Sequence, residues 1–325
     1  MPPPAAVSAV RTAVRRLLDS AEAAPFSAAP LAVACSGGPD SLALAAAAAH
    51  VVRDRPVRGL VVDHGLQEGS AEVADRTSEQ LQQLGLAEVQ VLPASVGTRG
   101  GLEAAARSAR YAALERARPE GGLVLLGHTR DDQAETVQLG QGRGSGPRSI
   151  AGMRPLNPPW ARPFLDVPRA ITLAACSDLG LQPWSDPHNA NPRFARVRLR
   201  TEVLPQLEDA LQGGVAAALA RTAAQLRDDQ DALEAYAARA LAAASTFEGA
   251  LDVRGLRDEP AAVRRRALRR WLLDQGVPEI SDEHLRAADE LVAHWRGQGS
   301  HRLPGNFVLR RTHGTLLVSG GITGR

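Results

Sequence analysis

The most informative feature of the sequence is a residue type that it lacks. All 38 basic side chains among its 325 residues are arginine, and no lysine occurs. A Walker-type phosphate-binding loop depends on its lysine. Schiff-base enzymes and ligases that form a lysyl adenylate need a lysine nucleophile. The composition therefore excludes all three classes of protein.

Cysteine is nearly absent, and long apolar runs are missing. Cys35 and Cys176 are too few for a disulfide framework or for a four-cysteine zinc site, so we expect no structural zinc. The first residues contain no apolar segment of signal-peptide length, and no apolar run of 18 residues occurs elsewhere. These absences predict a cytosolic protein with no membrane partner.

Charge is almost balanced over the whole chain but not locally. The formal net charge is only +2, so any attraction to nucleic acid has to come from clusters. Residues 140–200 contain nine arginines and three aspartates. Four of these arginines fall within eight residues: Arg193, Arg196, Arg198 and Arg200. This density favours a surface that faces nucleic acid, with a solvated basic face as the alternative.

Predicted strands and helices alternate in the N-terminal half. The apolar patterns predict strands at residues 31–35, 57–65, 87–94 and 122–128 and helices at residues 7–24, 41–52, 70–85 and 102–118, with another helix from residue 131. Ser70 and Gly85 are the expected capping residues of the third helix. The alternation predicts an α/β fold with a mostly parallel sheet covered on both faces, whose ligands bind outside the carboxyl ends of the strands.

The remainder of the chain divides into two further regions. The expected organisation is a catalytic domain at residues 1–205, an alanine-rich helical linker at 206–246 and a small α/β domain at 247–325. Residues 261–275 of the last domain form an arginine-heavy helix. A charge run of this kind is either a nucleic-acid contact or a solvated helix face.

A glycine-rich loop, Ser36-Gly37-Gly38-Pro39-Asp40-Ser41, follows the first predicted strand. Its glycines let backbone N–H groups turn toward an anion, and the next helix adds its positive end. Ser36 and Ser41 can donate to phosphate oxygens. Asp40 would repel bare phosphate, so it predicts a magnesium ion held between this carboxylate and the phosphates. The alternative is an ordinary strand-to-helix turn, which the two serines and the strand-end position disfavour.

A second polar cluster follows the fourth predicted strand. His128, Asp132 and Glu135 are spaced to share one side of a helix start. Carboxylates there could hold a metal or bind a cationic amine, although capping of the helix accounts for either Asp131 or Asp132.

The preceding helix carries three further candidates. Arg107, Arg110 and Tyr111 lie on one side of it, with a surface ion pair between Glu103 and Arg107 as the alternative to a site role.

Several ordered motifs resemble known families. "SGGPDS" is similar to the pyrophosphate loop of N-type ATP pyrophosphatases (the PP-loop superfamily), which cleave ATP to AMP without a loop lysine. "VVDHGL", "LEAAARSARYAAL" and "GHTRDDQAETV" resemble motifs of the tRNA(Ile)-lysidine synthetases. "GQGRGSGPRSIAGMRPL" and "WSDPHNANPRFARVRLRTEVLPQL" extend the resemblance over residues 30–210, and "HRLPGNFVLRRTHGTLLVS" does so more weakly. Gln67 and Thr129 depart from that family, which commonly has arginine and histidine there.

The resemblance implies a Rossmann-like PP-loop domain and an RNA-modifying ligase. Such an enzyme uses ATP and Mg²⁺ to adenylate the 2-carbonyl of the wobble cytidine in tRNA(Ile) with a CAU anticodon, and then attaches free L-lysine there. It releases AMP and pyrophosphate. The rival readings are a PP-loop tRNA thiolase and a non-catalytic nucleotide-dependent RNA-binding module. The sequence leaves open whether the chain acts alone or as a homodimer.

The resemblance also implies roles for residues. The ATP-binding set is Ser36, Gly37, Gly38, Pro39, Asp40, Ser41, Asp63 and Gly127, with Asp40 as the metal ligand. The catalytic set is Asp40, Arg107, Arg110, His128, Asp132 and Glu135, of which Asp132 and Glu135 would bind lysine and His128 is a candidate general base. Local charge density, and not the resemblance, gives the tRNA-binding set, which is Arg193, Arg196, Arg198, Arg200, Arg265 and Arg269.

Overall fold

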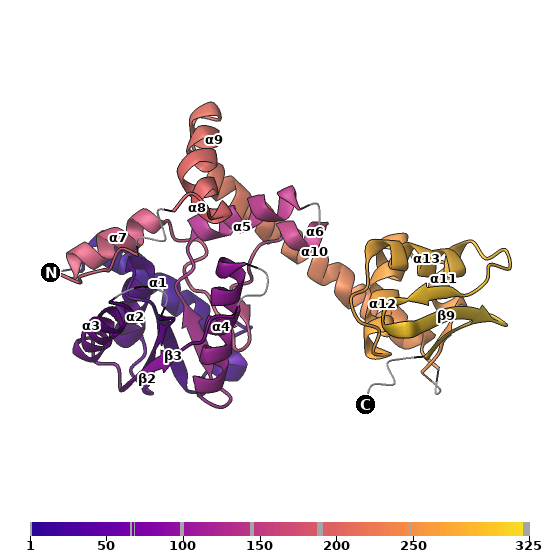
Figure 1. Cartoon of the computed structure of the whole chain (residues 1–325), viewed down its shortest axis with the longest axis horizontal. Helices are drawn as coiled ribbons and strands as arrows, with labels where there is room; N and C mark the ends of the chain where they lie inside the picture. The colour runs from indigo at the N-terminus through magenta and orange to yellow at the C-terminus, as the bar shows by residue number, and fades with distance from the viewer. Residues whose placement is uncertain are drawn as a thin grey trace. The chain divides into compact units, whose positions relative to one another are not determined.

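The structure, a computed structural model, describes residues 2–65, 67, 69–97, 101–143, 146–186, 191–246 and 249–320, with backbone only at residues 102 and 103. The chain forms two compact units, Met1–Ala224 and Gln225–Arg325 (Figure 1). Within the described ranges, no helix has both the length and the apolar character needed to cross a membrane.

The first unit is built on a six-stranded sheet. Its strands are β1 (Leu31–Cys35), β2 (Val57–Asp63), β3 (Glu88–Pro93), β4 (Leu123–Leu126), β5 (Leu156–Asn157) and β6 (Trp160–Ala161), in the order β3-β2-β1-β4-β6-β5. All neighbouring strands are parallel except β5 and β6. The predicted parallel sheet is therefore confirmed. The strand order changes direction between β1 and β4, which is where ligands bind in open α/β sheets.

Helices cover both faces of this sheet, unequally. One face packs against α1 (Ala5–Leu18), α2 (Pro39–Val51), α3 (Ser70–Gln83) and α7 (Arg169–Asp178). The other packs against α4 (Leu102–Ala117), which contributes Leu114 to a smaller core. The remaining helical segments of the unit are η1 (Ala24–Phe26), α5 (Arg130–Gly142), α6 (Pro147–Ile150), α8 (Ala195–Arg198), the π-helical turn η3 (Leu199–Val203) and α9 (Leu204–Ala210), and α10 (Val215–Ala244) begins there.

Two predicted helix ends were wrong. The helix expected at residues 7–24 ends at Leu18, because its buried stripe of Val7, Val10, Val14 and Leu17 stops there. The predicted cap Ser70 is the first helical residue of α3. Gly69, with φ of 81°, stands at the N-cap instead, since glycine tolerates that left-handed conformation.

The second unit contains an antiparallel sheet of four strands. These are β7 (Leu251–Asp252), β8 (His301–Leu303), β9 (Phe307–Thr312) and β10 (Thr315–Gly320), in the order β7-β10-β9-β8. Its helical segments are α11 (Arg254–Arg257), α12 (Ala261–Asp274), α13 (Asp282–Ala293) and the short turn η4 (Pro304–Asn306). One sheet face, these helices and the second half of α10 enclose a separate apolar core that includes Trp271 and Leu268.

Arginines of α12 hold this unit together. Arg264 Nε and Arg265 Nε donate to the two carboxylate oxygens of Asp289 on α13, at 2.7 Å and 3.0 Å. The Asp289 side chain is only 5% exposed. Arg269 donates to the Ile280 carbonyl at 3.1 Å, and Arg266 Nε lies 3.5 Å from Glu234 Oε1 of α10. Most of the predicted basic helix face is thus engaged within the unit.

We expect Asp289→Ala to lower the free energy of unfolding by about 3 kcal/mol, because it leaves Arg264 partly buried without its counter-charge. Asp282→Ala, which removes an exposed partner of Arg286 from the same helix, is the matched control and should cost well under about 1 kcal/mol. Urea denaturation of both variants measures the difference. Equal losses would show that the Asp289 contacts do not stabilise the unit.

Candidate active site

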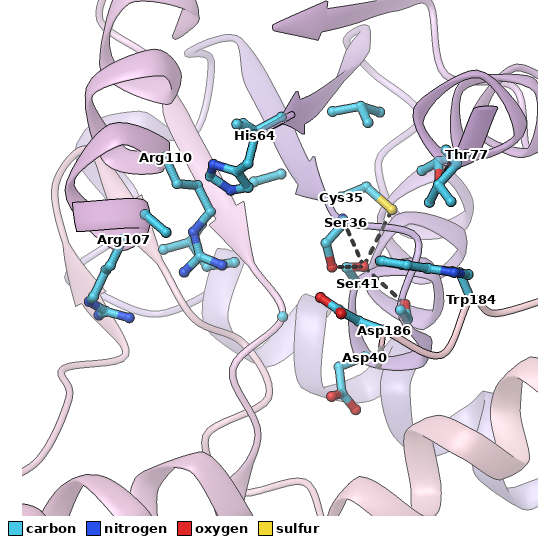
Figure 2. Close-up of a pocket in the computed structure, with 18 of the residues that line it drawn as sticks. Cys35, Ser36, Asp40, Ser41, His64, Thr77, Arg107, Arg110, Trp184 and Asp186 are labelled. Atoms are coloured by element: carbon cyan, nitrogen blue, oxygen red, sulfur yellow. Dashed lines mark hydrogen bonds between the residues drawn. The ribbon is translucent and has the colours of Figure 1, made fainter. Parts of the chain in front are cut away.

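A pocket of about 490 Å³ lies at the carboxyl ends of β1, β2 and β4, where the strand order changes direction. Figure 2 shows His64, Arg107 and Arg110 on one side of it and the loop of Ser36 and Ser41 with Trp184 on the other. The predicted residues that line it are Ser36, Gly38, Pro39, Asp40, Ser41, Asp63, Arg107, Arg110, Gly127, His128, Asp132, Glu135, Arg196 and Arg200. The lining does not include Gly37, Arg193 or Arg198. Arg265 and Arg269 belong to the other unit.

Glycine is required at two positions in and beside the loop, because neighbouring atoms leave no room for a Cβ atom there. Gly37 has φ of 79°, and a Cβ there would lie 2.5 Å from Thr77 Oγ1. A Cβ at Gly127 would lie 3.0 Å from the backbone of Asp40 and Ser41, so β4 can come this close only with glycine. Because α2 begins within the loop, at Pro39, its first N–H groups have no helical acceptor and can bind an anion.

Ser41 organises this loop from within. Its hydroxyl donates to the Gly38 carbonyl at 2.9 Å and accepts from the Ser36 backbone N–H at 3.1 Å. The Cys35 thiol also donates to it, at 3.4 Å. The Ser41 proton is therefore used inside the loop. The Ser36 hydroxyl lies 3.4 Å from the Ser41 hydroxyl and would have to turn away from this long contact to bind phosphate. The backbone N–H groups of the first turn of α2 are the other donors for phosphate.

Asp40 is held by two residues of α7 that sequence reasoning missed. Thr172 Oγ1 donates to one carboxylate oxygen, and Arg169 lies 3.4 Å from the other. Burial nevertheless raises the pKa of Asp40, outweighing the opposing effects of Arg169 and Thr172. No local motif marks Arg169 or Thr172. They meet Asp40 only because α7 packs on α2.

The surroundings of Asp40 fit a magnesium ion. Asp40 lies in the first turn of α2, directly after the glycine-rich loop, and lines the same pocket, so its carboxylate can share a metal ion with phosphates bound there. Among the described residues no group of three or more metal-ligating side chains occurs. A site of one carboxylate completed by substrate phosphates and water, a usual arrangement for Mg²⁺, needs no such group.

The acidic start of α5 is a paired charge cluster. Asp132 accepts from the backbone N–H of Thr129 at 2.8 Å, so it caps the helix, and its other oxygen lies 3.3 Å from Arg200. Glu135 is fully buried and accepts from Arg200 Nε at 2.6 Å. Arg196 lies 3.9 Å from its second oxygen. Thr129 is the N-cap residue of α5, and of the two aspartates expected to cap the helix, Asp132 takes part as the third residue of a capping box.

The positions of Asp131, Arg196 and Arg200 differ from those that the sequence suggested. Asp131 accepts from the backbone N–H of Arg169, which ties the start of α7 to α5. Arg196 and Arg200, grouped by sequence with the tRNA-binding arginines, line the pocket. Their neighbours Arg193 and Arg198 are exposed, and Arg198 pairs with Glu202 at 3.2 Å.

Two histidines face the arginines of α4 as neutral imidazoles. Burial and the nearby Arg110 guanidinium lower the pKa of His128 to about 3 and also lower the pKa of His64. The Nδ1 atoms of both rings are buried and have no hydrogen-bond partner among the described residues. Both rings are therefore neutral, and the low pKa of His128 makes it a weak base as long as no anion is bound beside Arg110. Sequence reasoning selected Asp63 from the same motif and missed His64.

Arg107 and Arg110 flank an aromatic ring. Their guanidinium carbons lie 5.0 Å and 5.6 Å from the centre of the Tyr111 ring, and Arg107 donates to its hydroxyl at 3.4 Å. Burial lowers the pKa of Arg110. The alternative partner of Arg107, the Glu103 side chain, lies outside the described residues.

The segment of residues 182–186 forms the pocket wall beside the loop. The backbone N–H of Trp184 donates to the Gly37 carbonyl at 2.9 Å, and Gln182 exchanges two hydrogen bonds with the Gln80 side chain of α3. Gln67 donates to Asp186 at 2.7 Å. Trp184 and Asp186 were within a motif that sequence reasoning recorded, but they were not selected as site residues. Phe194 and Thr77 also line the pocket.

Comparison with known families agrees with this architecture. The family described as "PP-loop domain" matches residues 9–207, and the family described as "TilS substrate binding domain" matches residues 251–317. The first match covers more than half of the chain, so the protein is a PP-loop protein. The second match falls within the second unit.

Curated relatives narrow the family. Proteins named tRNA(Ile)-lysidine synthase are 54% identical in Rhodococcus jostii (98% of this chain, 97% of the relative), 56% in Nocardia farcinica (97% and 96%) and 57% in Mycobacterium tuberculosis (89% and 87%). The chain belongs to the tRNA(Ile)-lysidine synthase family. This confirms the resemblance inferred from the motifs.

A solved structure shows the same fold at greater distance. The U34-tRNA thiolase NcsA from Methanococcus maripaludis aligns with a TM-score of 0.56 over 68% of this chain and 79% of its own, at 18% identity. At that identity the likeness concerns the fold alone.

We expect His128 to make stability fall with decreasing pH. Its folded pKa of about 3 lies below the ordinary value of 6.5, so only the unfolded chain gains a proton between these values. From pH 8 to pH 5 this group should remove about 2 kcal/mol from the free energy of unfolding. His128→Asn should remove that contribution, which urea titrations of both proteins at pH 8, 6.5 and 5 would measure. Parallel pH curves would contradict a neutral buried His128.

Proposed function

We propose that this chain ligates free L-lysine to the C2 position of the wobble cytidine in tRNA(Ile) with a CAU anticodon, consuming ATP and releasing AMP and pyrophosphate. The observation that carries the proposal is one pocket that joins a lysine-free phosphate loop to the carboxylate cluster of α5. The near end-to-end alignment with relatives named tRNA(Ile)-lysidine synthase supports the same reaction.

In the first step, the 2-carbonyl oxygen of cytidine attacks the α-phosphorus of ATP, and pyrophosphate leaves. The first-turn N–H groups of α2 and the Ser36 hydroxyl would hold the phosphates. Asp40 would hold Mg²⁺, which neutralises charge on the leaving pyrophosphate. Asp63 and Gly127 line the same pocket at the ends of β2 and β4 and would flank the nucleoside.

In the second step, the amine of lysine attacks C2, and AMP leaves with the former carbonyl oxygen. A free amino acid carries both an ammonium and a carboxylate, and the α5 cluster offers both partners. Asp132 and Glu135 would attract the ammonium, and Arg196 and Arg200 the carboxylate.

The attacking amine has to lose a proton, and charge develops on the leaving AMP. His128 is our candidate base from the sequence, but its pKa of about 3 makes it a weak base in the absence of a bound anion. The negative charge of a nucleotide beside Arg110 would raise that pKa toward the range of a general base, and the same holds for His64, whose pKa is also lowered. Arg107 and Arg110 would stabilise negative charge on the nucleotide.

The tRNA would contact both parts of the chain. We assign catalysis to residues 1–205, a linking role to residues 206–246 and tRNA binding to residues 247–325. Exposed Arg193 and Arg198 would face the anticodon arm. Arg265 and Arg269 were also predicted to bind tRNA. Their guanidinium groups already donate to Asp289 and to the Ile280 carbonyl, so only their remaining N–H groups could contact RNA. A cytosolic location stays a prediction from composition.

The cysteines argue against the thiolase alternative. Sulfur transfer needs a reactive thiolate. Burial raises the pKa of Cys35, and burial together with the nearby Asp40 carboxylate raises the pKa of Cys176 to about 12. Both thiols are buried, and that of Cys176 donates to the Pro39 carbonyl at 3.2 Å. They therefore pack and orient the loop as small side chains. A non-catalytic module would have no use for the α5 cluster.

The direct test is incorporation of labelled lysine into a tRNA(Ile) transcript. We expect incorporation that requires ATP and Mg²⁺, releases one AMP and one pyrophosphate per lysine, and stops when the wobble cytidine is replaced by uridine. The double variant Cys35→Ala, Cys176→Ala should keep this activity with at most a modest packing loss. No incorporation by the wild type, or complete loss in a folded double variant, would contradict the proposal.

We expect Asp40→Asn to lower the adenylation rate on the order of 100-fold or more, because a neutral amide coordinates Mg²⁺ poorly. A second readout is the Mg²⁺ dependence of ATP binding by calorimetry, which should be strong in the wild type and weak in the variant. Asp166→Asn, which changes an exposed aspartate paired with Arg16, is the control. If the folded Asp40 variant keeps both the rate and the Mg²⁺ dependence, Asp40 has no role in metal binding.

A further inference from the structure

We propose that the open face of the C-terminal sheet binds backbone phosphates of the substrate tRNA through Arg302 of β8 and Arg310 of β9. The inference rests on the proposed function, which makes tRNA the substrate. It adds the surface of the second unit that contacts the RNA, which differs from the helix that the sequence suggested.

The strand register divides this sheet into an apolar face and an open face. Leu303, Leu309 and Leu316 are buried in the core of the unit, and Phe307 and Val318 pack against them. Because side chains alternate along a strand, the residues between them point to the other side. This open face carries Arg302, Val308, Arg310, Thr312, Thr315, Leu317 and Ser319.

The two arginines are adjacent on this face. Arg302 is paired in register with Val308, and Arg310 is two residues further along β9. Diagonal neighbours of this kind lie about 7–8 Å apart. Both arginines are exposed, and neither has an ion pair among the residues that the structure describes. Val308 and Leu317, each half-buried, lie beside them and offer apolar surface to a sugar.

No acidic side chain on the strands offsets this charge except one that is already paired. Asp252 of β7 accepts hydrogen bonds from Arg254, including one at 2.8 Å from Nη2. That pair contributes no net charge. The face therefore presents two unopposed guanidinium groups, whose planar donor forks suit phosphate oxygens.

The arginines of the helices are less suited to this task. Arg264 and Arg265 share the buried Asp289 carboxylate, and Arg269 binds the Ile280 carbonyl. To bind RNA, they would have to weaken contacts that hold α12 to α13. The arginines on the sheet lose no such contact, so they can bind a polyanion without rearrangement of the unit.

A second copy of the chain fits this face poorly. In a two-fold interface the same patch meets itself. Two copies would then set pairs of arginines against each other, and the one strand carboxylate near them, Asp252, is already paired with Arg254. Only Val308 and Leu317 would add apolar area. Charge complementarity instead favours a phosphate backbone.

The experiment compares the double variant Arg302→Thr, Arg310→Thr with the wild type in binding to a tRNA(Ile) transcript at several salt concentrations. Threonine keeps strand propensity on an exposed face. Each lost phosphate contact lowers the magnitude of the slope of log K against log salt by about 1, so we expect a decrease of about 2. At physiological salt the affinity should fall on the order of tenfold.

Two further double variants serve as controls. Arg270→Ala, Arg286→Ala removes the same charge from exposed helical positions and should leave the slope unchanged. Arg265→Ala, Arg269→Ala tests the helix directly. If that variant lowers the slope and the sheet variant does not, the proposal is overturned. Should the threonine variant unfold, as judged by its melting curve, Arg302→Gln, Arg310→Gln repeats the test.

The outcomes separate the surface from the function. If the wild type incorporates lysine but the sheet variant binds tRNA with the wild-type slope, the surface is wrong and the function stands. If the wild type itself neither binds tRNA nor incorporates lysine, the function fails and the surface with it. A change in oligomeric state on size-exclusion chromatography, with unchanged tRNA binding, would identify the face as a contact between copies and overturn the proposal.

Discussion

The ion pair between Glu135 and Arg200 is the contact on which the arrangement of the pocket depends. A fully buried carboxylate is costly unless it is paired and hydrogen-bonded. One oxygen of Glu135 meets this condition, because the segment of Arg196 and Arg200 folds back onto α5 and Arg200 donates to it. The other oxygen is buried without a hydrogen bond, with Arg196 3.9 Å away, and burial raises the pKa of Glu135. That segment includes the π-helical turn η3, a form that occurs often at functional sites. The buried charge of Glu135 thus holds the segment of Arg196 and Arg200 in place as one wall of the pocket.

Other carboxylates of the pocket are also paired with arginines. Arg169 faces Asp40, and Arg200 bridges Asp132 and Glu135. Burial, and after it the positive charge of Arg110, lowers the pKa of His64 and His128, so both rings stay neutral. Of the two proposed ligands, ATP is an anion and lysine carries charges of both signs, so a pocket built from ion pairs can exchange internal partners for ligand groups. Burial raises the pKa of both Asp40 and Glu135 despite these partners, so an additional cation is favourable beside either carboxylate.

Sequence reasoning predicted the features that depend on local spacing. Polar residues at the ends of β1, β2 and β4 had to meet, because the ends of parallel strands share one edge of the sheet. The loop of Ser36 and Asp40 and the cluster of His128 and Asp132 do line one pocket.

Contacts that depend on packing between distant segments could not be read from the sequence. Thr172 and Asp40 are 132 positions apart, and Arg200 and Glu135 are 65 apart. Runs of arginine look alike in sequence whether they face solvent, a carboxylate or RNA. Only the fold separates Arg200, which lies against Glu135, from the exposed Arg193, and Arg265, which lies against Asp289, from the exposed Arg310.

Arginine suits the contacts at the α5 carboxylates better than lysine would. Arg200 reaches Glu135 with Nε and Asp132 with Nη2, so one planar guanidinium links two carboxylates. An ammonium group is a point charge and could not reproduce that fork. Arginine also keeps its charge when buried, whereas a buried lysine readily loses its proton. The internal cation that holds the carboxylate pair therefore differs in shape from the ammonium of the proposed substrate. That difference gives the pocket a physical basis for distinguishing its own side chain from its ligand.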